Sequence, residues 1–243
     1  MLRETGATRP RAKIVRETKM TSANVFSSKG GLAYTELRRR ITSGGLAPGS
    51  RLSQYELAEE LSMSITPLRE AIRRLASEDW VVMDAHRDVR VAPMSADEAR
   101  ELLEVRLSLE PSATELAARR RTEREITAMK AAADELLPVT RDWGEEAITA
   151  HRAFHRAIYA ASHNKVMIRL LDDLWDKADR YRRLGLELPA GAEPRIVDLN
   201  EHHRILELVI DGDGAAAADL VRTHIRNSLG ATVTGTLEYR ERA

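Results

Sequence analysis

The sequence predicts a mainly α-helical protein, with one small β-hairpin over residues 80–92 and an antiparallel helical bundle after it. Three observations support this fold class. Aromatic residues make up only 4% of the 243 residues, so Leu, Ile, Val and Ala must fill the cores, and this mixture favours helices over β-sandwiches. Apolar residues recur at spacings of three and four through most of the chain. Only the residues after Asp79 have a strand-like pattern.

The composition narrows the class of protein. With 43% hydrophobic and 31% charged residues, the chain is typical of globular proteins, and its length suits one large domain or two modest ones. The absence of cysteine excludes disulfides, thiol nucleophiles and thiolate metal sites. No run approaches the ~18 to 20 apolar residues of a membrane-spanning helix, and no apolar signal segment follows the first charges. We therefore expect no membrane partner and a cytoplasmic location.

Residues 1–31 are expected to form a flexible basic arm. They hold seven Lys and Arg against two Asp and Glu, and their apolar residues have no periodicity. The net charge of the whole chain is zero. Total charge is therefore a weak argument for or against a nucleic-acid partner, and the arrangement of basic side chains matters more.

Ordered structure is expected to begin at Leu32. A first helix is predicted over residues 32–41, because apolar residues there are spaced by three and four, and Gly44 follows as a stop signal. A second, short helix is predicted to begin at Ser53, since Glu56 three residues later completes a capping box.

Residues 32–94 together have the element order of a winged helix-turn-helix. A third helix follows the second after a few residues, with Ser64 or Thr66 as its cap and Pro67 in its first turn, where a missing N–H costs little. Two short helices joined by a tight turn indicate a helix-turn-helix. The hairpin over 80–92 comes directly afterwards and would be the wing.

Residues 95–243 are expected to form an all-α antiparallel bundle of six or so helices. The first begins at Ser95, which forms a second capping box with Glu98, and Pro111 within it implies a kink or a restart. The later helices are expected to begin at or near Thr122, Asp142, Asn164, Arg195 and Asp213.

The third helix and the wing carry side chains of the kind that contact DNA. These residues lie at the start of the third helix, away from its apolar stripe, or at the tip of the wing: Ser64, Thr66, Arg69, Arg73, Arg87 and Arg90. Each arginine alone is typical of a solvated surface. Because they lie on a helix-turn-helix that a hairpin follows, these residues together predict contacts with phosphates and base edges of double-stranded DNA.

Four of the seven histidines fall at apolar-facing positions of three predicted helices: His151, His155, His202 and His224. The first two are one helical turn apart, so both imidazoles project into the bundle together, and such a pair suits a divalent metal. A lone buried histidine is more often a core residue. Four inward histidines favour a metal site, and the other three, His86, His163 and His203, are expected to be surface or structural.

Parts of the sequence resemble a known family. The segment from Leu46 to Ala92, with PGSRLS, ELAEEL and TPLREAIRRL in this order, resembles the winged helix of GntR-family transcriptional regulators. The second half, with EVRLSLEPSATELAA, AFHRAIYAASHN, EHHRILELVIDGD and RTHI, is similar to the FCD ligand-binding domain of the FadR subfamily. The similarity covers about residues 32–235. It implies a dimeric regulator that binds a DNA operator and responds to a metabolite.

The chain departs from the family pattern at three positions. Tyr55 and Ile65 stand where the family commonly has arginine. Many FCD domains bind a metal through an aspartate and three histidines, which match the four histidines above, with His151 in place of the aspartate. An all-nitrogen ligand set favours Zn or Ni over Mn or Mg.

The resemblance also implies a small carboxylate effector, since a metal with open coordination positions can accept an anionic ligand. Arg106 is the candidate second contact, because it lies in the E-x-R stretch of the first bundle helix and guanidinium matches carboxylate geometry. The alternative is a buried salt bridge from Arg106 to Glu104 or to another acid.

Three functions remain open at this point. The first is a metabolite-responsive, homodimeric transcriptional regulator that is not an enzyme. The second is a helical metal-dependent hydrolase, since a metal in a bundle can activate water; against it, no carboxylate base is well placed beside the histidines except Glu201. The third is a structural metal-binding bundle with a vestigial winged helix.

Overall fold

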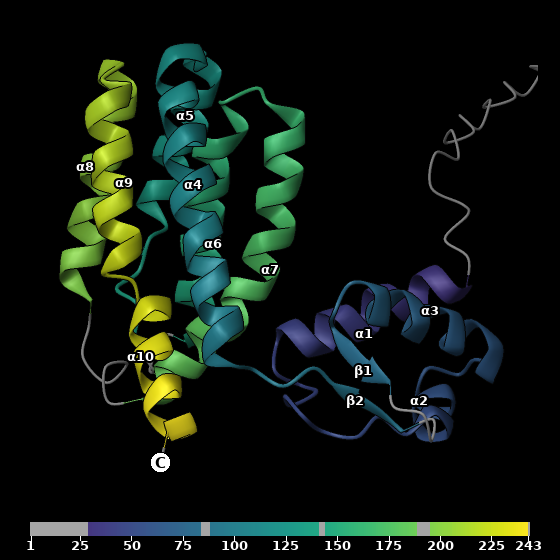
Figure 1. Cartoon of the computed structure of the whole chain (residues 1–243). Helices are drawn as coiled ribbons and strands as arrows, with labels where there is room; N and C mark the ends of the chain where they lie inside the picture. The colour runs from purple at the N-terminus through teal and green to yellow at the C-terminus, as the bar shows by residue number, and fades with distance from the viewer. Residues whose placement is uncertain (1–28, 84–87, 141–143, 189–194, 243) are drawn as a thin grey trace, which may run out of the picture.

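The computed structural model describes residues 29–83, 88–140, 144–188 and 195–242. Figure 1 shows two parts, a small one with helices and a hairpin and a larger helical bundle. The predicted fold class, a winged helix-turn-helix followed by a helical bundle, is confirmed. The predicted basic arm lies, up to residue 28, outside the described residues.

The small part has the predicted order of elements: α1 (Lys29–Thr42), α2 (Gln54–Glu60), α3 (Ile65–Ser77), β1 (Val81–Met83) and β2 (Val89–Val91). The two strands are antiparallel, with Val81 opposite Val91. Leu37, Leu68 and Trp80 are among the apolar residues that pack α1, α3 and the hairpin into one core.

Helix α1 begins at Lys29, three residues before the predicted start. The sequence there contains two glycines, which disfavour a helix. Gly30 lies against α3, where an added Cβ would approach Oε2 of Glu70 to 3.1 Å. Tertiary packing on α3 therefore extends the helix beyond the point that local propensity indicates.

The predicted caps are largely found. The hydroxyls of Ser53, Ser95 and Thr122 accept hydrogen bonds from the backbone N–H three residues later. Thr122 has the full reciprocal capping box. Ser64 is the N-cap of α3, without a side-chain cap bond, and Thr66 lies in its first turn. The predicted cap Asp142 lies outside the described residues.

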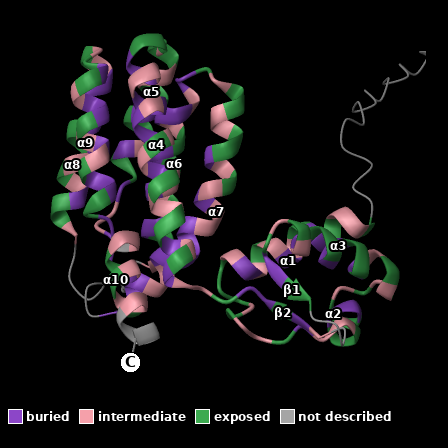
Figure 2. Ribbon diagram, in the orientation of Figure 1, coloured by how far each residue is buried: buried purple, intermediate pink, exposed green. Residues whose placement is uncertain are grey.

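The bundle consists of α4 (Ala96–Arg120), α5 (Glu123–Asp134), α6 (Gly144–Ala160), α7 (Lys165–Glu187), α8 (Ile196–Asp211), α9 (Gly214–Arg226) and α10 (Leu229–Arg242). Figure 2 shows its buried residues facing inward. Helix α4 packs against α6, α7, α8, α9 and α10. Phe154, Ile158, Trp175 and Ile205 are among the residues of the main core.

The structure adds two details to the predicted bundle. Of the kink or restart expected at Pro111, there is no restart, since α4 continues through this residue, although proline cannot donate the backbone hydrogen bond of its position. Helix α10 was not predicted, since its glycines and threonines have low helix propensity. It forms where Val233 is buried together with Tyr181 and Leu188. None of the described helices has the length and apolarity that a membrane crossing requires.

Candidate functional site

The four predicted histidines meet inside the bundle. His151 and His155 come from α6, His202 from α8 and His224 from α9. One nitrogen from each ring lies within 4.8 Å of the others. All four residues, the histidine cluster, are at most 4% exposed. The cluster could hold a divalent metal ion.

The sequence explains this convergence in two steps. His151 and His155 are four residues apart and share one face of α6. Helices α8 and α9 run antiparallel on either side of Gly212, whose φ of 83° ends α8, and Asp213, which caps α9. His202 lies ten residues before Gly212 and His224 twelve after it. With equal rise per residue, the two rings reach the same level of the bundle.

Burial disfavours protonation of three histidines of the cluster. It lowers the pKa of His151, His155 and His202 well below the usual value, and the neighbouring Arg182 lowers the pKa of His151 further. A neutral imidazole has a nitrogen lone pair that can bind a metal. These three histidines therefore have the protonation state that metal binding requires.

Hydrogen bonds around the cluster orient two of its rings. Nδ1 of His224 lies 2.8 Å from a carboxylate oxygen of Glu201, which can only accept, so Nδ1 carries the proton. Nδ1 of His155 lies 3.1 Å from the hydroxyl of Tyr159, which itself donates to Glu110 over 2.7 Å. Burial raises the pKa of Tyr159, so the phenol keeps its proton. Nδ1 of His155 must then donate, and the Nε2 lone pairs of both histidines remain for a ligand.

Two further observations fit a bound cation. Nε2 of His155 lies 3.0 Å from Nε2 of His202. This distance fits a hydrogen bond if His202 carries its proton at Nε2, and without that proton the two lone pairs would need a cation between them. Nδ1 of His151 is buried and has no hydrogen-bond partner within the described ranges. Buried polar atoms are seldom left without a partner, and a metal or its ligand would satisfy this one.

Arg106 is next to the cluster but is already paired. The residue is 4% exposed, and its Nε donates to Oε1 of Glu110 over 2.7 Å. The buried ion pair that was the alternative for Arg106 is thus present, with Glu110 rather than the exposed Glu104. Its Nη2 is buried without a partner among the described residues. One donor of Arg106 is therefore still available to a ligand.

Sequence reasoning missed Arg182 and Trp175 at this site. The guanidinium carbon of Arg182 lies 4.8 Å from the ring centre of Trp175, and that of Arg106 lies 5.4 Å from it. The ring of Trp175 is 5.1 Å from that of His155. Arg182 is fully buried beside Asp179, 2.6 Å away. A signal existed, because Arg182 follows Trp175 by seven residues and so shares its helix face.

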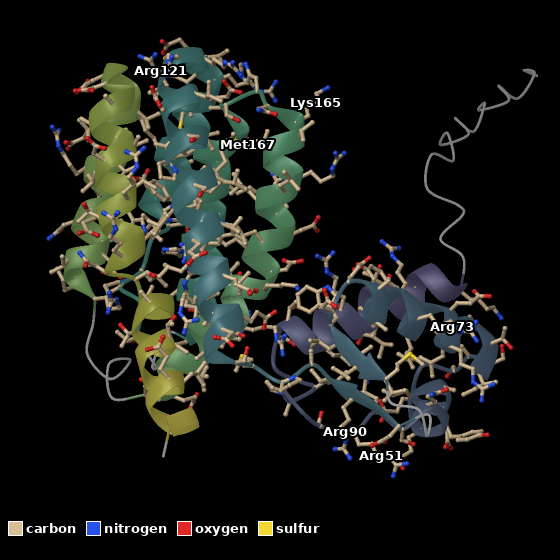
Figure 3. The ribbon with its side chains drawn as sticks, viewed as in Figure 1. Arg51, Arg73, Arg90, Arg121, Lys165 and Met167 are labelled. Carbon is tan, nitrogen blue, oxygen red and sulfur yellow. The ribbon has the colours of Figure 1, made fainter. Side chains whose placement is uncertain are left out.

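A second feature is a groove between α2, α3 and the wing, and two of the six predicted DNA-contacting residues line it. This groove, the wing groove, has a volume of about 760 Å³, and Arg69 and Arg73 line it together with Arg51 and Tyr55. Ser64 and Thr66 are exposed at the start of α3 but do not line the groove. Figure 3 shows Arg73 on α3 and Arg51 beside Arg90 at the wing.

The remaining positions have different surroundings. Arg90 is exposed and pairs with Asp88 in the wing, 2.9 Å away. Arg87 lies outside the described residues. Tyr55, one of the departures from the family pattern, is 77% exposed at the groove. Ile65, another departure, packs instead against the core of the small part.

Comparison with known proteins assigns the family. Residues 31–91 match the model of bacterial regulatory proteins of the gntR family, and residues 101–227 match the FCD domain. The chain belongs to the GntR family of transcriptional regulators. It is 30% identical to the regulator LutR of Bacillus subtilis over 77% of this chain and 93% of LutR. It is 27% identical to the repressor GlaR of Escherichia coli over 79% of this chain and 90% of GlaR.

Solved structures show the same fold. Escherichia coli McbR/YncC superposes on this GntR-family chain with a TM-score of 0.73 at 23% identity, over 90% of this chain and 100% of McbR. A GntR regulator from Rhodococcus has a TM-score of 0.68 at 22% identity, over 86% of this chain and 99% of its own. The relatives of this GntR-family protein are transcriptional regulators and not enzymes. This favours the regulator over the metal-dependent hydrolase.

Proposed function

We propose that this GntR-family regulator is a homodimer that binds a two-fold symmetric DNA operator through its winged helices. Its helical domain binds a divalent metal, with zinc or nickel preferred, together with a small carboxylate effector that modulates operator binding. The observation that carries the proposal is the convergence of four buried imidazoles beside two buried arginines.

The metal part rests on the histidine cluster. Its four nitrogens are the donors that borderline metals such as Zn and Ni prefer, whereas Mn and Mg favour oxygen. His224 and His155 are each oriented by a hydrogen-bonded partner, Glu201 and Tyr159, as is usual for metal-binding histidines. In this proposal His151 is a ligand at the position where many FCD domains have aspartate.

The effector part rests on charge. Arg106 and Arg182 are each balanced by a carboxylate, Glu110 and Asp179. Glu201 beside His224 supplies one further carboxylate, so a divalent ion would still leave positive charge uncompensated in the bundle. An anionic ligand would offset this charge. The unpartnered Nη2 of Arg106 is a donor that such a ligand could use.

The DNA part rests on the exposed side chains of α3 and the wing. Arg69 and Arg73 would reach base edges and phosphates from α3, with Ser64, Thr66, Arg87 and Arg90 as further contacts. One short recognition helix contacts few bases, and a two-fold symmetric dimer doubles the number.

The domain limits belong to the same proposal. The DNA-binding domain would cover residues 32–94 and the effector- and metal-binding domain residues 95–243. The basic arm would precede α1, which begins at Lys29. The cytoplasmic location expected from the sequence is also part of the proposal, because bacterial operator DNA lies there.

A ligand screen tests the effector part. Zinc-loaded protein is heated with a set of small organic acids, and a ligand that binds only the native state raises the melting temperature. Arg106→Ala should remove the rise for the acid that binds, whereas Arg119→Ala, which alters an exposed pair on the same helix, should leave it unchanged. If no carboxylate raises the melting temperature of the zinc-loaded protein, the proposed effector class is wrong.

A further inference from the structure

Residues 49–52, which precede α2, run along the wing as a short additional strand. Three backbone hydrogen bonds of 2.7 to 3.0 Å join this segment to β2. Arg51 pairs with Arg90 across the two strands in an antiparallel bridge. Residues directly opposite each other in such a pair have their side chains on the same face. Two arginines therefore lie side by side at the wing, as Figure 3 shows.

The carboxylate of Asp88 forms an ion pair with each of these arginines. Asp88 has Oδ1 at 2.7 Å from Nε of Arg51, and Oδ2 at 3.0 Å from Nε and 2.9 Å from Nη2 of Arg90. The third nitrogen of Arg90, Nη1, donates to the carbonyl of Gly49 over 3.3 Å. All three guanidinium nitrogens of Arg90 are thus occupied within the wing itself.

Arg51 is bound only at one side. Its Nε contacts Asp88, while its two terminal nitrogens meet no acceptor in the part of the chain that the structure describes. The side chain of Arg51 is 73% exposed and that of Asp88 only 20%. The Asp88 carboxylate therefore lies on the protein side of the Arg51 guanidinium. The edge of the guanidinium that carries the two terminal nitrogens faces solvent and is available to a ligand.

The position of Arg51 indicates the ligand. Arg51 and Asp88 line the wing groove together with Arg69 and Arg73 of α3, whereas Arg90 does not line it. At this edge of the wing, Arg51, Arg90 and Asp88 together carry one net positive charge. A guanidinium edge with two parallel donors matches a phosphate, and arginine contacts at the rim of a DNA interface are mostly to phosphates.

We propose that Arg51 binds a phosphate of the DNA backbone at the wing edge of the groove, and that Asp88 and Arg90 are positioning residues that orient its guanidinium. The proposal rests on the proposed DNA-binding surface and changes which residues of that surface contact DNA directly. Arg51 becomes a direct contact, and Arg90 acts through Asp88.

The role of Asp88 separates this proposal from a simple charge effect. Removing a carboxylate from a DNA-binding groove should strengthen DNA binding if only the total charge matters. Under the proposal, Asp88→Asn instead weakens binding, because Arg51 loses the partner that orders its long side chain. Glu56→Gln is the matched control. Glu56 lines the same groove and has no ion pair to a described residue, so its removal should strengthen binding slightly.

The experiment measures the binding of the full chain to a fluorescently labelled duplex of mixed sequence over a range of salt concentrations. A phosphate contact carries no sequence information, so the operator need not be known. Arg51→Ala should lower the affinity about tenfold and reduce the salt slope by about one per contact. Asp88→Asn should weaken binding to a similar extent. The variant that combines Arg51→Ala with Asp88→Asn should bind DNA no more weakly than Arg51→Ala alone, because the two residues act as one unit.

Several results would overturn the proposal. Stronger binding by Asp88→Asn, of the kind expected for Glu56→Gln, would contradict the positioning role of Asp88. A wild-type salt slope in Arg51→Ala would contradict the phosphate contact. Arg51→Lys guards against a folding defect, since it keeps the charge but not the paired donors, and should bind more weakly than wild type. If the wild type binds no duplex, the DNA-binding proposal fails as a whole. If the wild type binds and Arg51→Ala is unchanged, only the role of Arg51 fails.

Discussion

Nη2 of Arg38 in α1 lies 2.9 Å from Oδ2 of Asp176 in α7, and this ion pair joins the winged helix to the bundle. The other oxygen of Asp176 lies 2.5 Å from Nη1 of Arg152. Arg152 follows His151 directly on α6. On the other side, α1 packs against α3. A chain of direct contacts thus leads from the histidine cluster to the helix proposed to read DNA.

Arg38→Ala should weaken the coupling between metal binding and DNA binding. The affinity for DNA is measured for zinc-loaded and for chelator-treated protein, and the ratio of the two is the coupling factor. Coupling energies of this kind are typically about 1 to 3 kcal/mol, and the ratio should move toward one in the variant. Arg39→Ala is the control, because Arg39 pairs with Glu36 on its own helix. An unchanged ratio in Arg38→Ala would exclude this route.

Metal content tests the histidine cluster directly. After reconstitution with zinc at neutral pH, the wild type should retain roughly one ion per chain by elemental analysis. His155→Ala and His202→Ala should retain far less, since each removes one ligand. His203→Ala should behave as the wild type, because His203 is exposed and adjacent to the cluster only in sequence. If the wild type retains much less than one ion per chain, the metal-site proposal is wrong and these histidines only pack in the core.

The metal-free protein should lose stability as the pH falls below about 6.5. Burial lowers the pKa of His151, His155 and His202 in the folded state, whereas in the unfolded chain each has a pKa of about 6.5. Below that pH the unfolded state binds protons that the folded state cannot, so the free energy of unfolding decreases. Bound metal should be released over the same range, because protons compete for the ligand nitrogens.

Melting curves of chelator-treated protein at several pH values show how strongly the melting temperature depends on pH. His202→Phe removes one buried imidazole while keeping an aromatic ring, and its melting temperature should depend less on pH than that of the wild type. An equal dependence in both proteins would mean that other groups cause the acid sensitivity.

Arg69→Ala should reduce both affinity and sequence preference for an operator selected from random duplexes. A bidentate contact to a base is worth about 1 to 3 kcal/mol of discrimination. Arg74→Ala is a control on the same helix, since its guanidinium lies 3.7 Å from the ring centre of Tyr34 and pairs with Glu78, away from the groove. If Arg69→Ala keeps wild-type affinity and preference, α3 is not the recognition helix in the proposed orientation.

Features set by neighbouring residues could be predicted from the sequence. The caps at Ser53, Ser95 and Thr122 depend on a residue three positions later, and the shared face of His151 and His155 depends on one helical turn. Strand-like spacing after Asp79 was enough to predict the wing. The inward direction of all four cluster histidines also followed from periodicity, because each lies on the apolar face of its own helix.

Contacts between distant residues required the tertiary structure. The Arg106–Glu110 pair has the i,i+4 spacing that helices favour, but no spacing rule predicts that Glu110 also accepts a hydrogen bond from Tyr159 on another helix. Helix α10 and the first turn of α1 form through packing that local propensity opposes. Arg51 meets Asp88 because backbone pairing brings residues 49–52 beside β2. Sequence patterns report which face of an element is apolar, whereas the partner across that face is decided by how the elements pack.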